Sequence, residues 1–421
     1  MGGHVQGRLL PVVVGGDLGV YSLVRAFHEE FGCKAVVVTP RVTHQIQYSS
    51  LVSSTYVEPL LQDPQVLVET LERVASEHPG CTLLLLANTD WYVRAIVDNT
   101  DRLAEHYLLP FCSPEAFAQV ADKGVFTKVC NSLGIPTPAT VPVDIATLRA
   151  QGGKAAVEAL VIDLDFPLVA KPASTAEYEY LTMPGKKKVD HLATRADLDD
   201  LLCRLLDAGY DGTFLIQEIV EGDETHMRSL TVYRDTRGKV TMAASGQVLL
   251  EEHAPGMLGN PAAILTMPFA GTVDDVTKFL DEVGYTGFAD VDFKFDKRTG
   301  RHVYFEVNPR IGRNNYFVTA AGVSPARAVV ADLVEGRSVE PTPPADGVLF
   351  SVVPFRLLLR YITDPDLRAK VCKAKRSRRV AHPMRYRADT GPRRRFVVEA
   401  VTARYWTKYR RYYPRPTPDG F

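Results

Sequence analysis

The sequence predicts a mixed α/β and α+β chain that begins with a parallel sheet, and three observations lead to this prediction. Short apolar runs alternate with amphipathic stretches through the first third of the chain. Further along, alternating strand patterns are paired across turns such as the DKRTG run at 296–300, which is typical of hairpins. With 421 residues, of which 46% are hydrophobic and 24% charged, the chain is long enough for two or three packed domains.

Residues 1–112 form the first predicted domain, which is Rossmann-like. Strands alternate with helices here, so we expect parallel strands joined by helical crossovers. The GGDLG turn at Gly15–Gly19 lacks the full spacing of a dinucleotide loop, and we interpret it as a tight strand-to-helix turn near a substrate pocket. The expected elements are strands around Pro11, Ala35 and Thr82 and helices at about 18–31 and 63–77.

A second domain is expected at 113–340, with a smaller lobe at about 125–220 and a larger lobe at about 221–340. Ser113 followed by Pro114 is a typical helix start, because serine caps and proline occupies the first helical position. The expected elements are a strand at 166–173, a helix at about 195–208, a strand at 214–222, a hairpin at 230–250, a helix at 273–283, two strands carrying Asp292 and Glu306, and a helix after Asn315.

Polar side chains gather at the end of the last of these strands, in the run YFEVNPRIGRNNY from Tyr304 to Tyr316. Glu306 and Asn308 are two positions apart, so both leave the same face of an extended segment. Asp292 lies fourteen residues upstream, in the neighbouring strand of the predicted hairpin. Oxygen ligands that converge in this way suit Mg²⁺, which leaves its other positions to water and phosphates. The strand end therefore predicts a magnesium site and phosphate chemistry.

Five features in a fixed order resemble the ATP-grasp superfamily. They are Lys123 in a D-K-x-x-F-T-K helix, Lys171 at the end of an apolar strand, the hinge QEIVEGDE, Asp292, and a terminal E-x-N-P-R. The resemblance implies the ATP-grasp fold, in which two small α+β lobes clamp ATP. Lys171 by itself also indicates an anionic ligand. A buried ammonium costs roughly several kcal/mol unless it meets a counter-charge such as phosphate.

The same resemblance implies a role for each matched residue. Lys123 and Lys171 would contact the ATP phosphates, with Lys171 also near the adenine, and Glu224 would hold the ribose hydroxyls. Mg²⁺ would bridge the phosphates, and Arg310 would donate to the phosphoryl group or the acyl phosphate. The loop at 174–188 would close over the triphosphate and exclude water. Gln217, Glu218 and Val220 would line the adenine edge, and Asp292, Glu306 and Asn308 would hold the metal.

Several longer segments, among them KPASTAEYEY and GQVLLEEHAPGMLGNPAAI, look like the carboxylate-amine ligase branch that includes peptidoglycan D-aspartate ligases. In that branch an amino acid is activated as its acyl phosphate and joined to an amino group of a cell-wall precursor peptide. The identity and chirality of the amino acid and the identity of the acceptor stay open. We place six polar residues around the substrates: Arg228, Glu252, His253, Asn260, Arg313 and Asn314. Arg310 and Arg313 would face one pocket if a helix has begun there.

Two other functions stay open. A soluble dipeptide or amino-acid ligase of the same superfamily would make a small metabolite instead of modifying a cell-wall peptide. A non-catalytic ATP-binding regulatory protein is disfavoured, because a pure binder need not keep the metal ligands.

The C-terminal segment, 341–421, is basic and rich in tyrosine. From Ser351 onward there are 19 Lys and Arg and 5 Asp and Glu, whereas the remaining 350 residues have 30 and 45. Such a segment suits peripheral contact with an anionic membrane surface or docking on the acidic body of the protein. Nucleic-acid binding is disfavoured, since no recognised motif is present. Only the first part, VLFSVVPFRLLLRYI, is expected to contribute to a core.

The six cysteines are scattered without a C-x-x-C pair, which favours a reducing compartment. No apolar run is long enough for a secretory signal or a membrane span. We therefore expect a cytoplasmic protein, with the membrane contact described above as an added property. The oligomeric state stays open.

Overall fold

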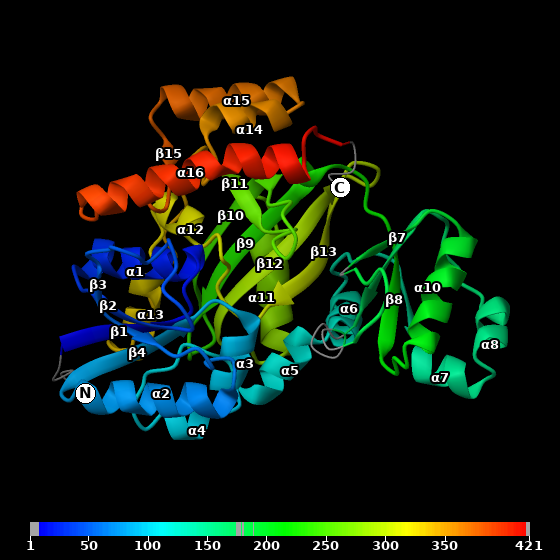
Figure 1. Ribbon diagram of the computed structural model, residues 1–421, viewed down its shortest axis with the longest axis horizontal. Helices are drawn as coiled ribbons and strands as arrows, with labels where there is room; N and C mark the ends of the chain where they lie inside the picture. The colour runs from blue at the N-terminus through cyan, green and yellow to red at the C-terminus, as the bar shows by residue number, and fades with distance from the viewer. Residues whose placement is uncertain (1–7, 174–177, 179–180, 188, 418–421) are drawn as a thin grey trace. The chain divides into compact units, whose positions relative to one another are not determined.

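The computed structural model describes residues 8–173, 178, 181–187 and 189–417. Residues 174–177, 179, 180 and 188 of the expected lid lie outside this part. The chain folds into two compact units (Figure 1). Unit 1 comprises Met1–Phe117, Gly222–Asp292 and Val307–Phe421, and unit 2 comprises Ala118–Glu221 and Phe293–Glu306. The predicted boundaries near residues 112 and 340 concern functional domains and stay predictions.

A four-stranded parallel sheet forms the N-terminal part of unit 1, in the order β3-β2-β1-β4. Strands that are covered on both faces read as continuous apolar runs, and PVVV in β1 and LLLLA in β4 are fully buried. The predicted parallel sheet is confirmed. Its strands are β1 (Arg8–Val14), β2 (Ala35–Thr39), β3 (Val52–Val57) and β4 (Cys81–Ala87).

Helix α1 (Leu18–Phe31) occupies its predicted range. The Asp17 carboxylate caps it by accepting the Val20 amide at 3.0 Å. Gly15 has a φ of +112°, a conformation that residues with a Cβ rarely adopt, so GGDLG is a tight strand-to-helix turn. Three further helices, α2 (Pro64–Glu77), α3 (Asp90–Val97) and α4 (Thr100–Leu103), complete this part.

A seven-stranded sheet in the order β13-β12-β9-β10-β11-β14-β15 follows. The predicted hairpin is confirmed, with Leu230 opposite Ser245 in an antiparallel pair. The two strands predicted around Asp292 and Glu306 are neighbours in this sheet. The strands are β9 (Met227–Arg234), β10 (Val240–Glu251), β11 (Pro261–Thr266), β12 (Gly287–Asp296), β13 (Arg301–Asn308), β14 (Leu349–Ser351) and β15 (Val380–Ala381).

Helices from the second half of the chain complete unit 1. The predicted helices after Thr272 and Asn315 are both present. The helices are α11 (Thr272–Glu282), α12 (Tyr316–Ala320), α13 (Pro325–Leu333), α14 (Phe355–Tyr361), α15 (Pro365–Arg376) and α16 (Pro392–Tyr412).

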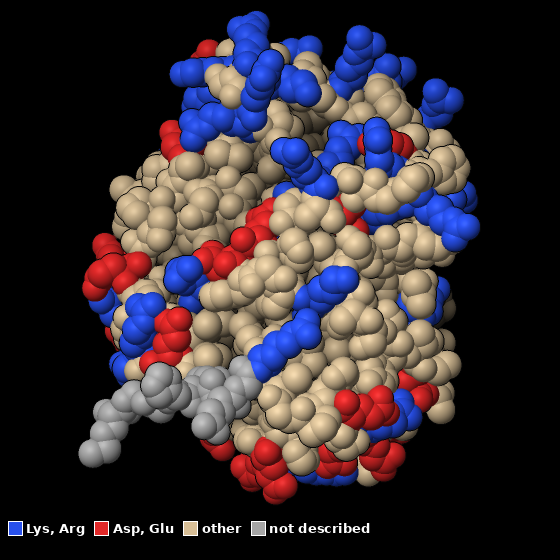
Figure 2. Space-filling view, turned by 90° about the vertical axis from the view of Figure 1, so that its left-hand side faces the viewer, with Lys and Arg blue, Asp and Glu red and all other residues tan. Residues whose placement is uncertain are grey.

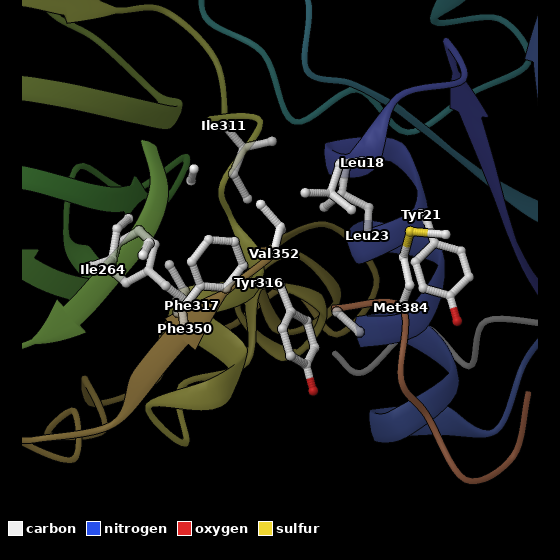
Figure 3. Close-up of a cluster of buried hydrophobic side chains, with 14 of the residues drawn as sticks. Leu18, Tyr21, Leu23, Ile264, Ile311, Tyr316, Phe317, Phe350, Val352 and Met384 are labelled. Carbon is white, nitrogen blue, oxygen red and sulfur yellow. The ribbon is translucent and has the colours of Figure 1, made fainter. Parts of the chain in front are cut away.

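One apolar core joins the N-terminal, central and C-terminal parts of unit 1. Tyr21 of α1, Phe317 of α12, Phe350 of β14 and Met384 belong to the same buried cluster (Figure 3). Val398 and Tyr409 of α16 belong to it as well. The expectation that only the start of the basic segment contributes to a core is therefore wrong.

Unit 2 is built on a four-stranded antiparallel sheet in the order β5-β8-β6-β7. Its strands are β5 (Thr140–Asp144), β6 (Leu168–Pro172), β7 (Asp190–Leu192) and β8 (Thr213–Glu218), and its helices are α6 (Lys123–Ser132), α7 (Ile145–Ala150), α8 (Lys154–Ala159) and α10 (Arg195–Asp207). Leucines at 198, 201, 202 and 205 recur at helical spacing in α10, and all four are buried in the core of this unit. Helix α5 (Pro114–Ala121) begins at the predicted Ser113–Pro114 start.

Candidate active site

The ends of β12 and β13 carry the residues expected to bind magnesium. The Asn308 amide nitrogen lies 3.2 Å from Asp292 Oδ2 and 3.2 Å from the Asp290 carbonyl oxygen. Glu306 precedes Asn308 by two positions in β13, so strand alternation directs both side chains to one face. The structure thus brings Asp292 and Asn308 into contact, as the sequence predicts.

A carboxylate that the sequence analysis missed, Asp290, lies beside this pair. It is buried and accepts a hydrogen bond from Thr231 Oγ1 at 2.8 Å. Burial raises the pKa of Asp290, while the charge of Arg310 opposes this rise. A Cβ at Gly312 would overlap the Asp290 carboxylate, so the glycine leaves room for it. The D-V-D repeat at 290–292, which places both aspartates on one strand face, was the available sequence signal.

Arg310 lies against the acids of unit 1. Its Nε donates to Asp90 Oδ1 at 2.7 Å, and its Nη2 lies 3.3 Å from Asn308 Oδ1. Burial lowers the pKa of Arg310, but the charge and hydrogen bond of Asp90, with the charges of Asp290 and Asp292, outweigh burial and raise it. The guanidinium therefore keeps its charge next to the candidate metal ligands.

Arg313 and Asn314 occupy turns rather than the start of a helix. Helix α12 begins only at Tyr316, so the helical spacing considered for Arg310 and Arg313 does not apply. Arg313 Nε lies 3.6 Å from Asp17 Oδ2, and its Nη2 lies 3.9 Å from Glu252 Oε1. Asn314 is buried, and its amide contacts Ser229 Oγ at 3.4 Å. Arg313 thus lies between an acid of the N-terminal part and an acid after β10.

Glu252 is fully buried, and its carboxylate meets the C-terminal helix α16. Tyr405 Oη donates to its Oε1 at 2.9 Å, and Lys408 forms an ion pair with its Oε2. The sequence analysis missed both partners, since more than 150 residues separate them from Glu252. Without such contacts a buried carboxylate would be costly, so α16 stabilises this part of the site.

Glu224 and His253 also contact each other. Glu224 Oε2 accepts the Glu251 amide at 2.6 Å and lies 3.2 Å from His253 Nε2. The His253 ring stacks on Tyr413 with 3.6 Å between the ring centroids. Burial raises the pKa of Glu224, and the hydrogen bond from His253 opposes this rise. The role of Glu224 in holding ribose stays a prediction.

Arg228 is buried in β9, not exposed on one face of the strand. Its Nη1 donates to the carbonyl oxygens of Thr225 and Met227, at 2.8 and 2.9 Å, while its Nε has no hydrogen-bond partner among the described residues. Burial lowers the pKa of Arg228 to about 10. A buried cation of this kind favours an anion as its missing partner. Asn260 instead donates to the Met257 carbonyl oxygen within its own loop, at 2.8 Å.

Lys123 contacts Glu306 within unit 2. Lys123 begins helix α6, which is capped by the Asp122 carboxylate. Its Nζ lies 3.4 Å from Glu306 Oε2, and both side chains are partly exposed. A predicted phosphate-binding cation and a predicted metal-binding carboxylate therefore meet.

The remaining predicted nucleotide residues lie on β6 and β8 of unit 2. Lys171 is half-buried, with its Nζ 6.0 Å from the centre of the Phe305 ring. Gln217 is buried and donates to Thr140 Oγ1 at 2.7 Å. Glu218 accepts the Ala139 amide at 3.0 Å, and Val220 is buried just beyond β8.

The donor set suits magnesium. Asp292, Glu306 and Asn308 offer only oxygen ligands from carboxylate and amide groups, which Mg²⁺ prefers, and they are too few to fill an octahedron without water or phosphate. Within the described ranges, no group of three or more His, Cys, Asp or Glu side chains is arranged to hold a metal ion. The three ligands Asp292, Glu306 and Asn308 leave coordination positions open for water or nucleotide phosphates.

Comparison with known proteins shows one similarity in sequence and several in fold. No protein-family model matches the chain. D-aspartate ligase from Enterococcus faecium is 29% identical over 414 residues, which cover 96% of this chain and 97% of that protein. The solved structure of the L-amino acid ligase from Bacillus licheniformis superposes with a TM-score of 0.53 at 16% identity, over 79% of this chain and 75% of that chain.

The biotin carboxylase domain of 2-oxoglutarate carboxylase from Hydrogenobacter thermophilus, solved with MgADP, superposes with a TM-score of 0.59 at 13% identity. It covers 80% of this chain and 73% of that domain. At such low sequence identities the structural similarity shows the fold alone. The sequence similarity to D-aspartate ligase extends over nearly the whole chain. The chain has the ATP-grasp fold, and its sequence resembles that of D-aspartate ligase over nearly its whole length.

Proposed function

We propose that this protein is an ATP-dependent carboxylate-amine ligase, which releases ADP and phosphate as it forms an amide. The observation that carries the proposal is the contact between Lys123 and Glu306, 3.4 Å apart. A lysine for phosphate oxygens beside a carboxylate for Mg²⁺ is the pairing that phosphoryl transfer from Mg-ATP requires. The likeness to D-aspartate ligase supports the same reaction.

Each protein residue has a part in this proposal. Asp292, Glu306 and Asn308 hold the metal, and Lys123 and Lys171 bind phosphate oxygens. Bound Mg-ATP supplies the phosphoryl group that turns the carboxylate into an acyl phosphate. Gln217, Glu218 and Val220 line the adenine edge, and Glu224 holds the ribose.

Arg310 stabilises the charge that develops on the transferred phosphoryl group. Its raised pKa keeps it protonated, and its planar fork of donors matches two phosphate oxygens. Asp90 orients the guanidinium through two contacts, at 2.7 and 3.3 Å. The protein supplies position and charge, and the proposal requires no covalent nucleophile.

The amino-acid substrate meets two cations and a set of polar groups. Arg228 lacks an acidic partner among the described residues, and Arg313 is held by two acids only at 3.6 and 3.9 Å. An amino acid with two carboxylates leaves one free after activation, and an arginine suits that group. Aspartate of the D series, as in the relative's name, is our first candidate. Glu252, His253, Asn260 and Asn314 complete the predicted surroundings.

The test is ADP release with Mg-ATP across D- and L-amino acids, with and without a lysine-containing acceptor peptide. We expect Glu306→Ala and Asp292→Asn to reduce turnover by at least about a hundredfold, because water cannot replace the negative charge of a carboxylate that binds the metal. Exposed Glu340→Ala serves as the control. Full activity in Glu306→Ala would show that the metal assignment is wrong.

A second candidate, ligation of two free amino acids, is favoured by the structural likeness to an L-amino acid ligase. Both candidates use the same residues on the ATP side and differ in the acceptor. Free amino acids and cell-wall peptides, offered in parallel to the same preparation, separate them. Product with free amino acids alone would select the second candidate.

Membrane contact is a separate part of the proposal. Lys and Arg side chains gather at the top of unit 1, where α14 and α15 lie (Figure 2). We define the basic face as six exposed cations after α14, each of which contributes about 1 kcal/mol near an anionic surface. They are Lys370, Lys373, Lys375, Arg376, Arg378 and Arg379. Across the described residues, no helix is long and apolar enough to span a bilayer.

Sedimentation with vesicles that contain anionic lipid, at low and high salt, tests this contact. We expect the wild-type protein to bind at low salt, and replacement of Lys373, Lys375 and Arg376 by alanine to weaken binding. Binding that is unchanged in the triple variant would remove the basic face from the proposal. We place the reaction itself in the cytoplasm, where free thiols such as the six cysteines here persist.

A further inference from the structure

A groove of about 590 Å³ lies between the loop after β2 and helix α16, outside the residues assigned so far. Its loop side is formed by His44, Gln47 and Tyr48. Its helix side is formed by Pro392, Arg393, Phe396, Val397, Ala400, Val401 and Arg404. Both sides belong to unit 1.

The helix side is an apolar stripe between two arginines. Positions 393, 396, 397, 400, 401 and 404 recur at helical spacing, so they share one face of α16. The Phe396 side chain is 76% exposed and Tyr48 is 52% exposed, so two aromatic side chains lie open to solvent at one groove. The stripe therefore has the character of a binding surface.

Charge limits what the groove accepts. Arg393 and Arg404 lie eleven positions apart, about 16 Å along a helix. None of the residues that line the groove is acidic. Arg393 lies over the Tyr48 ring at 5.9 Å, and Arg404 Nη1 lies 3.5 Å from His44 Nε2. A fitting ligand is extended, partly apolar and negatively charged.

The groove is held open by a buried ion pair behind its floor. Arg394, which follows Arg393, pairs with Asp389 at 3.0 Å and donates to the carbonyl oxygens of His44 and Gln47. Tyr48 has a φ of +60°, which is rare for a residue with a large side chain. The loop is thus fixed against α16, and the groove does not depend on a ligand to form.

One end of the groove adjoins the candidate substrate residues. Thr43, next to His44, donates to the Gly16 carbonyl oxygen, and Gly16 precedes Asp17. Tyr405, next to Arg404, donates to Glu252. Asp17 and Glu252 are the two acids that flank Arg313. The end formed by His44 and Arg404 is therefore linked to that cluster through Thr43 and Gly16 on one side and through Tyr405 on the other.

We propose that this groove binds the acceptor as an extended acidic peptide, with its amine directed toward the Asp17–Arg313–Glu252 cluster. The proposal rests on the ligase function proposed above. An extended peptide advances about 3.3 Å per residue, so about five residues span the two arginines. Arg393 and Arg404 bind peptide carboxylates, and the apolar stripe covers aliphatic side chains.

Direct binding tests the groove without turnover. The probe is a five-residue peptide with one lysine and two carboxylates, titrated calorimetrically into the full chain. Arg404→Ala and Phe396→Ala are each expected to raise the peptide Kd by about tenfold, as for a central interface residue. The same peptide with both carboxylates converted to amides is expected to bind weakly to the wild type. Arg395→Ala and Leu60→Ala, which remove an exposed cation and an exposed apolar side chain outside the groove, are expected to leave the Kd unchanged.

Three outcomes would overturn the proposal: an unchanged Kd in both groove variants, equal binding of the amidated peptide, or loss of vesicle binding in Phe396→Ala with an unchanged peptide Kd. Circular dichroism of each variant shows whether it is folded. Steady-state kinetics then separates this proposal from the ligase function. Peptide binding without any ADP release would leave the groove in place and remove the ligase function. ADP release with an acceptor KM that is unchanged in both groove variants would leave the ligase function in place and remove the groove as the acceptor site.

Discussion

At the scale of the residue, the buried charge of Arg228 lowers the stability of the fold, and the same charge is proposed to bind the amino-acid substrate. It is a buried guanidinium that forms no ion pair with a carboxylate of the described residues, and burial lowers its pKa to about 10. The cost of its charge is present at every pH below about 10 and declines only above it. We expect Arg228→Met to raise the free energy of unfolding by about 1 to 3 kcal/mol and to abolish amino-acid binding. Urea denaturation without substrate measures the first effect and calorimetry the second.

Arg394→Met provides the contrast, because Arg394 is also buried but is paired with Asp389. This variant is expected to lose stability. If Arg228→Met were destabilised as much as Arg394→Met, the charge of Arg228 would be satisfied within the fold, and its assignment to a substrate anion would fail.

His382 predicts a loss of stability in acid. Burial lowers its pKa to about 3, with further lowering by the charges of Arg385 and Arg25. The unfolded chain protonates this residue below about pH 6.5, so the unfolded state binds the extra proton between pH 6.5 and 3. Stability from this source is complete above pH 6.5 and declines as the pH falls. Between pH 7 and 5 we expect the wild type to lose about 2 kcal/mol more than His382→Asn.

Urea denaturation at both pH values checks this expectation, with exposed His106→Asn as the control. Equal losses in wild type and His382→Asn would show that other groups account for the acid sensitivity.

The sequence indicates which residues belong to the candidate site better than it indicates which side chains contact them. Asp292, Asn308 and Arg310 follow from spacing in one strand pattern, because alternation places neighbours on a common face. The contacts of Glu252 with Tyr405 and Lys408 do not, because they depend on how α16 packs. The burial of Arg228 also depends on the packing around β9.

At the scale of the element, the difference between α1 and β3 shows what local patterns determine. Helix α1 has a cap, an apolar face and a glycine after its last turn, and its predicted range is the observed one. Strand β3 reads VSSTYV, is only partly buried, and was not predicted. It pairs with β2 at the sheet edge, so its existence depends on a neighbour more than on its own sequence.

One buried carboxylate, Asp389, links helix α16 to the N-terminal part of unit 1. Asp389 accepts Tyr21 Oη at 2.8 Å, the Ser50 amide at 2.7 Å and Arg394 Nε at 3.0 Å. Asp389→Ala leaves a buried arginine without its acid, and we expect a loss of about 3 to 5 kcal/mol in the free energy of unfolding. Asp389→Leu combined with Arg394→Met is expected to restore part of it. Denaturation in urea compares the three proteins.

Glu399→Ala removes the exposed ion pair with Arg385 from the same helix and is expected to cost under about 1 kcal/mol. If Asp389→Ala lost no more free energy of unfolding than Glu399→Ala, the buried pair would not be what holds α16 in place.

At the scale of the whole molecule, the basic segment is part of the fold of unit 1. Strand β14 pairs with β11, and Phe350, Val352 and Met384 lie in the same core as Leu18 and Tyr21 of α1 (Figure 3). From the sequence, residues 341–421 are predicted to be a separate segment, because their charge and tyrosine content differ from those of the rest of the chain. Its buried residues are too widely spaced along the sequence to be recognised as one core, and only the packed structure brings them together.

A chain that ends at residue 340 is therefore expected not to fold. It lacks the partner of β11, a large share of the core that includes Phe350 and Met384, and the residues of α16 that contact Glu252. An unpaired edge strand beside an exposed core favours aggregation. We expect no cooperative thermal transition by circular dichroism, whereas the full chain unfolds cooperatively. A native spectrum and a sharp transition in the shorter chain would make 341–421 an independent segment. Tests of membrane binding consequently need substitutions on the surface of α15, since deleting the segment would remove the fold along with the charge.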